Sequence, residues 1–150
     1  MKRSLEFVWL SLVVLATLVR VRRWLWRDGL RTTIDRATAS LTDRHATAVV
    51  TSDAAASELR RVMREDEIIS WWLVKLRVSS ICLYRSLVMM RRLSQFPSVT
   101  SIEFVLGVKK TPTHPMAHSW LMLNGCEFRQ SPEIWGECQV VARICREAPA

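Results

Sequence analysis

The chain has few glycines and prolines, four and five respectively among 150 residues. This scarcity excludes a low-complexity sequence. Apolar residues make up 49% of the chain and charged residues 24%. With this length and composition, we expect one globular domain plus an appendage rather than two full domains.

The sequence also lacks a Cys-x-x-Cys pair. Its four cysteines follow no regular framework: they are Cys82, Cys126, Cys138 and Cys145. This spacing disfavours both a zinc ribbon and a disulfide-dense secreted scaffold. We therefore expect no metal and no cofactor, and a reducing, cytoplasmic location is the simpler interpretation.

No apolar run has the length of a standard membrane-spanning helix. The run from Phe7 to Val19 is shorter than the roughly 20 residues that a spanning helix needs. No small-residue cleavage site follows it. We expect neither a spanning helix nor a cleaved signal peptide.

Positive charge is concentrated at the N-terminus. The formal charge of the chain is +8, and residues 1–31 hold seven lysines and arginines against two acidic residues. Residues 4–27 are predicted to form one helix, apolar first and then strongly basic, with tryptophans among the arginines. One interpretation buries this helix against the domain or a partner subunit. The other makes it a peripheral membrane-surface anchor, because tryptophan and arginine together suit the headgroup region.

The division of the chain follows from its turn signals. Asp28-Gly29 is a predicted turn, and residues 42–52 form the predicted connector. We therefore separate an N-terminal segment, residues 1–52, from a globular domain, residues 53–150. The globular part shows no single-faced basic stripe, so no nucleic-acid partner is expected.

Helices are predicted first in the globular domain. One begins at Ser52 or Asp53, and another begins near Ser80 and runs to about Gln95. The charged side chains of the first helix are interpreted as a solvated face, made of Arg60, Arg61, Arg64, Glu65, Asp66 and Glu67.

Strands are predicted after the helices. The segments with strand patterns are 100–109, 117–123, 126–130 and 139–144. Asn124-Gly125 between the second and third of these is a strong hairpin signal. Helices followed by a small antiparallel sheet indicate an α+β fold.

Cys82 lies two or three residues after a helix-start signal. With Ser79 or Ser80 as N-cap, the cysteine falls in the first helical turn. Free backbone N–H groups and the positive end of the helix dipole favour a thiolate there. His118 on a later strand is the candidate base of a thiol enzyme. The alternative is a buried cysteine that acts as a small hydrophobic residue.

Three segments resemble the transglutaminase-like leader peptidase of lasso peptide biosynthesis, over roughly residues 55–145. They are Cys82-Leu83-Tyr84-Arg85-Ser86-Leu87, Phe104-Val105-Leu106-Gly107-Val108, and Ala117-His118-Ser119-Trp120 with the Asn124-Gly125 turn. The resemblance implies a papain/transglutaminase-like core with Cys82 as nucleophile and His118 as base. It also implies a cysteine endopeptidase that removes the leader from a ribosomally made precursor and supplies the core peptide to a macrolactam-forming cyclase.

The third catalytic position departs from the family pattern. Where the family commonly has an acidic residue after the histidine, this chain has Gln130, and its turn has Asn124 in place of aspartate. Gln130 is thus the candidate for orienting His118. An amide can orient an imidazole, but it stabilises the imidazolium less than a carboxylate does.

The hairpin register decides whether Gln130 can reach the histidine. A two-residue turn pairs Leu123 with Cys126 and places Gln130 opposite Ser119, on the face away from His118. A three-residue loop that includes Leu123 places Gln130 directly across from His118. If the protein is an active triad enzyme, we predict the three-residue loop.

Three further residues are candidates for the substrate cleft. Trp120 shares the face of His118 on its strand, so it is expected to wall the cleft. His114 is expected in a loop near the site. Arg85 lies one helical turn from Cys82, where an ion-pair or surface role is equally open.

The resemblance also implies partners. The region before residue 53 is too short and too apolar to be a winged-helix leader-recognition segment, so a stand-alone peptidase with a separate leader-binding protein is expected. The other partners are the precursor peptide and the cyclase. The competing hypothesis is a non-catalytic membrane-associated or scaffold protein whose basic N-terminal helix meets anionic lipid.

Overall fold

Three helices pack with one four-stranded antiparallel sheet in the computed structural model, which describes residues 2–42, 52–128 and 138–147. The helices are α1 (Lys2–Thr42), α2 (Ser52–Lys75) and α3 (Ile81–Leu93). The strands are β1 (Ser101–Lys109), β2 (Met116–Leu123), β3 (Cys126–Phe128) and β4 (Gln139–Glu147). The sheet order is β3-β2-β1-β4, so the coarse α+β prediction is confirmed.

Helix α1 bends sharply at Gly29, at the turn that the sequence predicts. Gly29 has φ 78° and ψ 178°, a conformation that an L side chain rarely adopts. We call residues 2–28 the N-terminal limb and residues 30–42 the C-terminal limb. An ion pair between Asp28 and Arg36 joins the two limbs.

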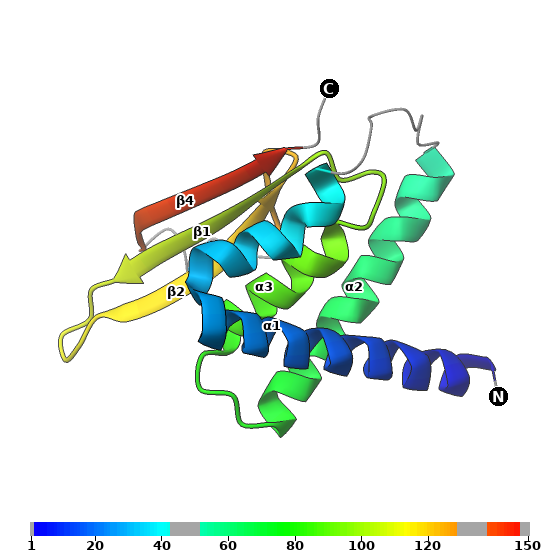
Figure 1. The fold of residues 1–150 in the computed structure, drawn as a ribbon, viewed down its shortest axis with the longest axis horizontal. Helices are drawn as coiled ribbons and strands as arrows, with labels where there is room; N and C mark the ends of the chain where they lie inside the picture. The colour runs from blue at the N-terminus through cyan, green and yellow to red at the C-terminus, as the bar shows by residue number, and fades with distance from the viewer. Residues whose placement is uncertain (1, 43–51, 129–137, 148–150) are drawn as a thin grey trace.

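The N-terminal segment shares one core with the rest of the protein. On the N-terminal limb, the residues that face the core recur every three or four positions: Leu10, Val14, Leu18 and Val21. The C-terminal limb buries Ile34, Ala37 and Leu41, and it runs over α3 to reach β4 (Figure 1). No helix among residues 2–42, 52–128 and 138–147 is long and apolar enough to cross a membrane.

Two acidic residues of α2 are buried, so the predicted solvated face is wrong at these positions. Glu65 is fully buried and Asp66 is nearly so. Both fall three or four positions after Val62 and before Ile69, which places them on the core side of α2.

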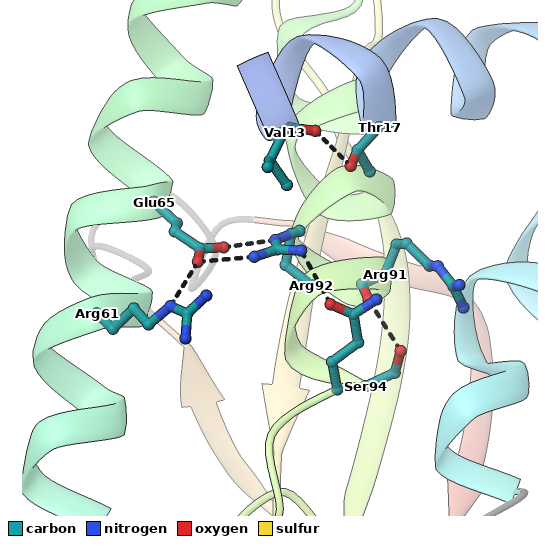
Figure 2. Close-up of polar contacts among 8 residues, drawn as sticks. Val13, Thr17, Arg61, Glu65, Arg91, Arg92 and Ser94 are labelled. Atoms are coloured by element: carbon teal, nitrogen blue, oxygen red, sulfur yellow. Dashed lines mark hydrogen bonds and ion pairs between the residues drawn. The ribbon is translucent and has the colours of Figure 1, made fainter. Parts of the chain in front are cut away.

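The buried Glu65 carboxylate joins α2 to α3. It accepts hydrogen bonds from Arg92 Nε at 2.6 Å and from Arg92 Nη2 at 2.9 Å. Arg61 Nε adds a third at 3.2 Å, and Figure 2 shows the three side chains between the two helices. A buried carboxylate needs such partners, because an unpaired charge is costly away from water.

The hairpin between β2 and β3 has a two-residue turn. Leu123 pairs with Cys126, so the predicted three-residue loop is wrong. Asn124 and Gly125 both have positive φ, 50° and 79°, as a type I′ turn requires.

The side chain of Asn124 explains this register. Its Oδ1 accepts hydrogen bonds from the backbone N–H groups of Thr100 and Ser101, at 2.9 and 3.0 Å. Its Nδ2 donates to the Ser98 carbonyl at 3.0 Å. An ionised aspartate cannot make this last bond, because it has no donor. Asn124 thus anchors the turn to the start of β1.

Candidate active site

Cys82 and His118 line the same narrow cavity, where the N-terminus of α3 meets β2. Cys82 is the second residue of α3, and Ser80 occupies the N-cap position without a side-chain capping bond. The cavity measures about 30 Å³. Its wall consists of Asp66, Cys82, Arg85, Ser86, Met89, His118, Ser119, Trp120, Leu121 and Phe128.

The surroundings of the Cys82 thiol lower its pKa, so that it ionises near neutral pH. A hydrogen bond with the His118 side chain is the main cause that lowers the pKa of Cys82 from 9.0 to about 7. Partial burial acts in the opposite direction, and backbone and side-chain hydrogen bonds with Ser119 lower the pKa further. Near pH 7, about half of the Cys82 side chains are therefore thiolates, the nucleophilic form.

Trp120 and Gly107 shape the surroundings of His118. The Trp120 ring stacks on the imidazole with centroids 5.9 Å apart, and Gly107 pairs with His118 across β1 and β2. A Cβ at Gly107 would lie 2.9 Å from the Trp120 ring and 3.1 Å from the Cβ of Cys138. Glycine is needed here because the indole occupies the space of a side chain.

Two serines hold β2 against α3. The Ser86 hydroxyl donates to the Ser119 carbonyl at 3.2 Å, and the Ser119 hydroxyl lies 3.4 Å from the Ser86 hydroxyl. Both residues are buried. Because Ser119 follows His118 directly and Ser86 lies one turn after Cys82, this contact brings the thiol and the imidazole together.

Arg85 lies in the cavity wall as one half of an ion pair. Its Nε and Nη2 donate to the two carboxylate oxygens of Asp66, each at 2.7 Å. Asp66 is 2% exposed. The hydrogen bonds with Asp66 raise the pKa of Arg85. A charged guanidinium, held by Asp66, therefore lies in the same cavity wall as Cys82.

The structure does not place the other predicted site residues in this cavity. His114 is exposed in the loop between β1 and β2 and is not part of the wall. Gln130 lies outside the described residues. The register that would bring Gln130 across from His118 is wrong, because Leu123 pairs with Cys126.

Sequence reasoning missed Asp66, Ser86 and Ser119 as members of the site. A signal existed for Asp66, since an acidic residue on the core side of a helix needs a cationic partner. The serines gave no such signal, because their roles depend on how α3 packs on β2.

The described residues contain no group of three or more histidine, cysteine or acidic side chains arranged to hold a metal ion. No protein-family model, curated protein or solved structure matches the chain.

Proposed function

We propose that this protein is a cysteine endopeptidase that removes the leader from a ribosomally made lasso peptide precursor. The observation that carries the proposal is that Cys82, in the first turn of α3, and His118 on β2 line one cavity, where the imidazole lowers the pKa of the thiol to about 7. The resemblance of the motifs around both residues supports the choice of substrate. A narrower fold assignment, a papain/transglutaminase-like core, is part of the same proposal.

In the acylation step, the Cys82 thiolate attacks the carbonyl carbon of the last leader residue. The carbonyl oxygen becomes an oxyanion, and the backbone N–H of Cys82 can stabilise it because N–H groups in the first helical turn have no acceptor within the helix. The His118 imidazolium then gives its proton to the leaving nitrogen. The C–N bond breaks, and the core peptide leaves with a free amino terminus.

In the deacylation step, water attacks the thioester that joins Cys82 to the leader. His118, left neutral by acylation, takes a proton from this water, and collapse of the tetrahedral intermediate expels the Cys82 thiolate, so the thiolate–imidazolium pair is regenerated. The C–S bond breaks, and the leader leaves with a free carboxylate. The freed amino terminus of the core is the group that a macrolactam-forming cyclase needs.

The small cavity supports the expectation of a separate leader-binding protein. A space of about 30 Å³ beside Cys82 holds little more than one water molecule. It offers too little surface to bind a leader peptide tightly, because affinity needs a larger buried contact. The partner would supply that affinity and present the cleavage point to Cys82.

The test is cleavage of the precursor in the presence of the leader-binding protein. We expect the unchanged enzyme to release leader and core, and Cys82→Ala to release neither. Cys126→Ala is the matched control, because Cys126 is exposed and lies outside the cavity wall. Equal cleavage by the unchanged enzyme and Cys82→Ala would refute the proposal, and no cleavage by either would favour the non-catalytic scaffold hypothesis.

A further inference from the structure

The N-terminal limb of α1 is apolar on two sides. One side packs on the core, as described above. The other side leaves large apolar side chains in solvent: Val8, Trp9, Leu12, Val19 and Trp26. Trp9 is 66% exposed and Trp26 is 89% exposed. Exposed apolar groups gathered on one helix mark a surface that meets a partner or a membrane.

Arginines follow this apolar surface along the same limb. Arg20, Arg22, Arg23 and Arg27 are exposed. The one acidic residue beside them, Asp28, is already paired with Arg36. The C-terminal half of the limb therefore presents uncompensated positive charge.

A cavity at the bend of α1 combines both properties. It measures about 790 Å³, within the range of small-molecule sites. Its apolar part includes Leu12, Leu15, Ala16 and Val19, and its charged part consists of Arg20, Arg23, Arg27 and the ion pair of Arg36 with Asp28. A ligand that fits has an apolar chain and an anionic head.

We propose that the N-terminal limb of α1 docks on the surface of a bilayer that contains anionic phospholipids. The apolar side chains enter the acyl boundary, the tryptophans lie at headgroup level, and the arginines meet the lipid phosphates. Figure 1 shows this limb crossing α2, with its N-terminal end extending past that helix. This placement leaves the limb accessible to a flat surface.

Lipid fits this surface better than an acidic protein partner does. No charged residue occurs from Phe7 to Val19. A helix-to-helix seam in solution is usually flanked by charged side chains that select the partner, and this segment has none. Acyl chains need no such pairing. In this proposal the limb lies on the membrane surface, because its apolar run from Phe7 to Val19 is shorter than the roughly 20 residues that a spanning helix needs.

The experiment is co-sedimentation of the full chain with vesicles made of equal parts of phosphatidylglycerol and phosphatidylcholine, compared with vesicles of phosphatidylcholine alone. We expect binding to the anionic vesicles only. The triple variant R22Q/R23Q/R27Q should bind on the order of a hundredfold more weakly, since each arginine near an anionic surface contributes about a fivefold factor. Trp26→Ser should also weaken binding. Because Trp26 is exposed, this substitution should leave the fold intact, so weaker binding would report on the surface itself.

The matched control removes the same charge elsewhere. The variant R60Q/K110Q/R143Q changes exposed residues on α2, the β1–β2 loop and β4. Its binding should stay within about threefold of the unchanged protein, because distant charges are screened. Equal losses in both triple variants, binding to phosphatidylcholine vesicles, or no binding to either kind of vesicle would overturn the proposal. Cys82→Ala should bind vesicles normally, so this test is independent of the peptidase proposal.

Discussion

Replacing His118 with alanine should return the Cys82 thiol to ordinary acidity. The hydrogen bond with His118 is the largest cause that lowers the pKa of Cys82 to about 7, and burial opposes it. Without the imidazole, the remaining hydrogen bonds with Ser119 compete with burial. We expect the pKa to rise toward its ordinary value of 9.0.

The size of the effect follows from these two values. Near pH 7, a thiol with a pKa of about 7 is half ionised, whereas one with a pKa of 9.0 is only about 1% ionised. The thiolate population therefore falls by roughly fiftyfold. Each remaining thiolate is about eightfold more nucleophilic, because nucleophilicity rises with pKa. The net rate of reaction with a disulfide reagent should fall by roughly sixfold.

The assay measures the rate of thiol–disulfide exchange at each cysteine across pH, with the modified peptides separated by mass spectrometry. The midpoint for Cys82 should move from near pH 7 to near pH 9 in His118→Ala. Cys145 is the internal control, because burial and then the nearby Glu147 raise its pKa and it lies outside the site. An unchanged Cys82 midpoint in the variant would refute the assigned contact.

The lowered pKa of Cys82 also makes the stability of the fold depend on pH. The fold favours the ionised form of Cys82, because its pKa is lower in the folded protein than the ordinary value. The stabilisation is therefore complete above about pH 9 and is lost as the pH falls through about 7.

Two further predictions concern packing. Arg92→Met should lower the free energy of unfolding, measured by urea denaturation, by about 3 kcal/mol, because the buried Glu65 carboxylate then keeps only Arg61 as a described partner. Adding Glu65→Leu to this variant should recover most of the loss. Equal stability of Arg92→Met and the unchanged protein would contradict the burial of this pair. Gly107→Ala should push the Trp120 ring away from His118 and slow the proposed leader cleavage, at a cost of about 1 to 3 kcal/mol in stability. Gly125→Ala is its control, since open space surrounds that position and only its positive φ is strained; equal slowing of cleavage by both variants would show that Trp120 is not involved.

The local pattern of the sequence predicted most of the elements, because their signals are local. Asp28-Gly29 indicated a turn where α1 bends, and the strand pattern of residues 100–109 indicated where the sheet begins. The helix predicted to begin near Ser80 is confirmed, because α3 spans Ile81–Leu93. Glycine conformation and side-chain spacing depend on neighbours in the chain, so they are readable without the fold.

The register of the β2–β3 hairpin could not be predicted from local sequence as the helices and strands could. Asn124-Gly125 favours a two-residue turn on its own, and the structure has that turn. The three-residue loop is predicted only if Gln130 has a catalytic role opposite His118. The contacts of Asn124 with Ser98 and Thr100 depend on a strand end that lies far away in the sequence.

The sequence by itself determined which residues have reactive chemistry: a cysteine at a helix start, a histidine on a strand, and a helix that is apolar and then basic. Only the tertiary structure decided which of them meet. The contact of Ser86 with Ser119 packs α3 against β2 and brings Cys82 near His118. The ion pair with Arg85 places Asp66, which the sequence suggested to be a surface residue, in the cavity wall. The physical reason is that burial and pairing of polar groups depend on which elements pack together, and these elements are distant in the chain.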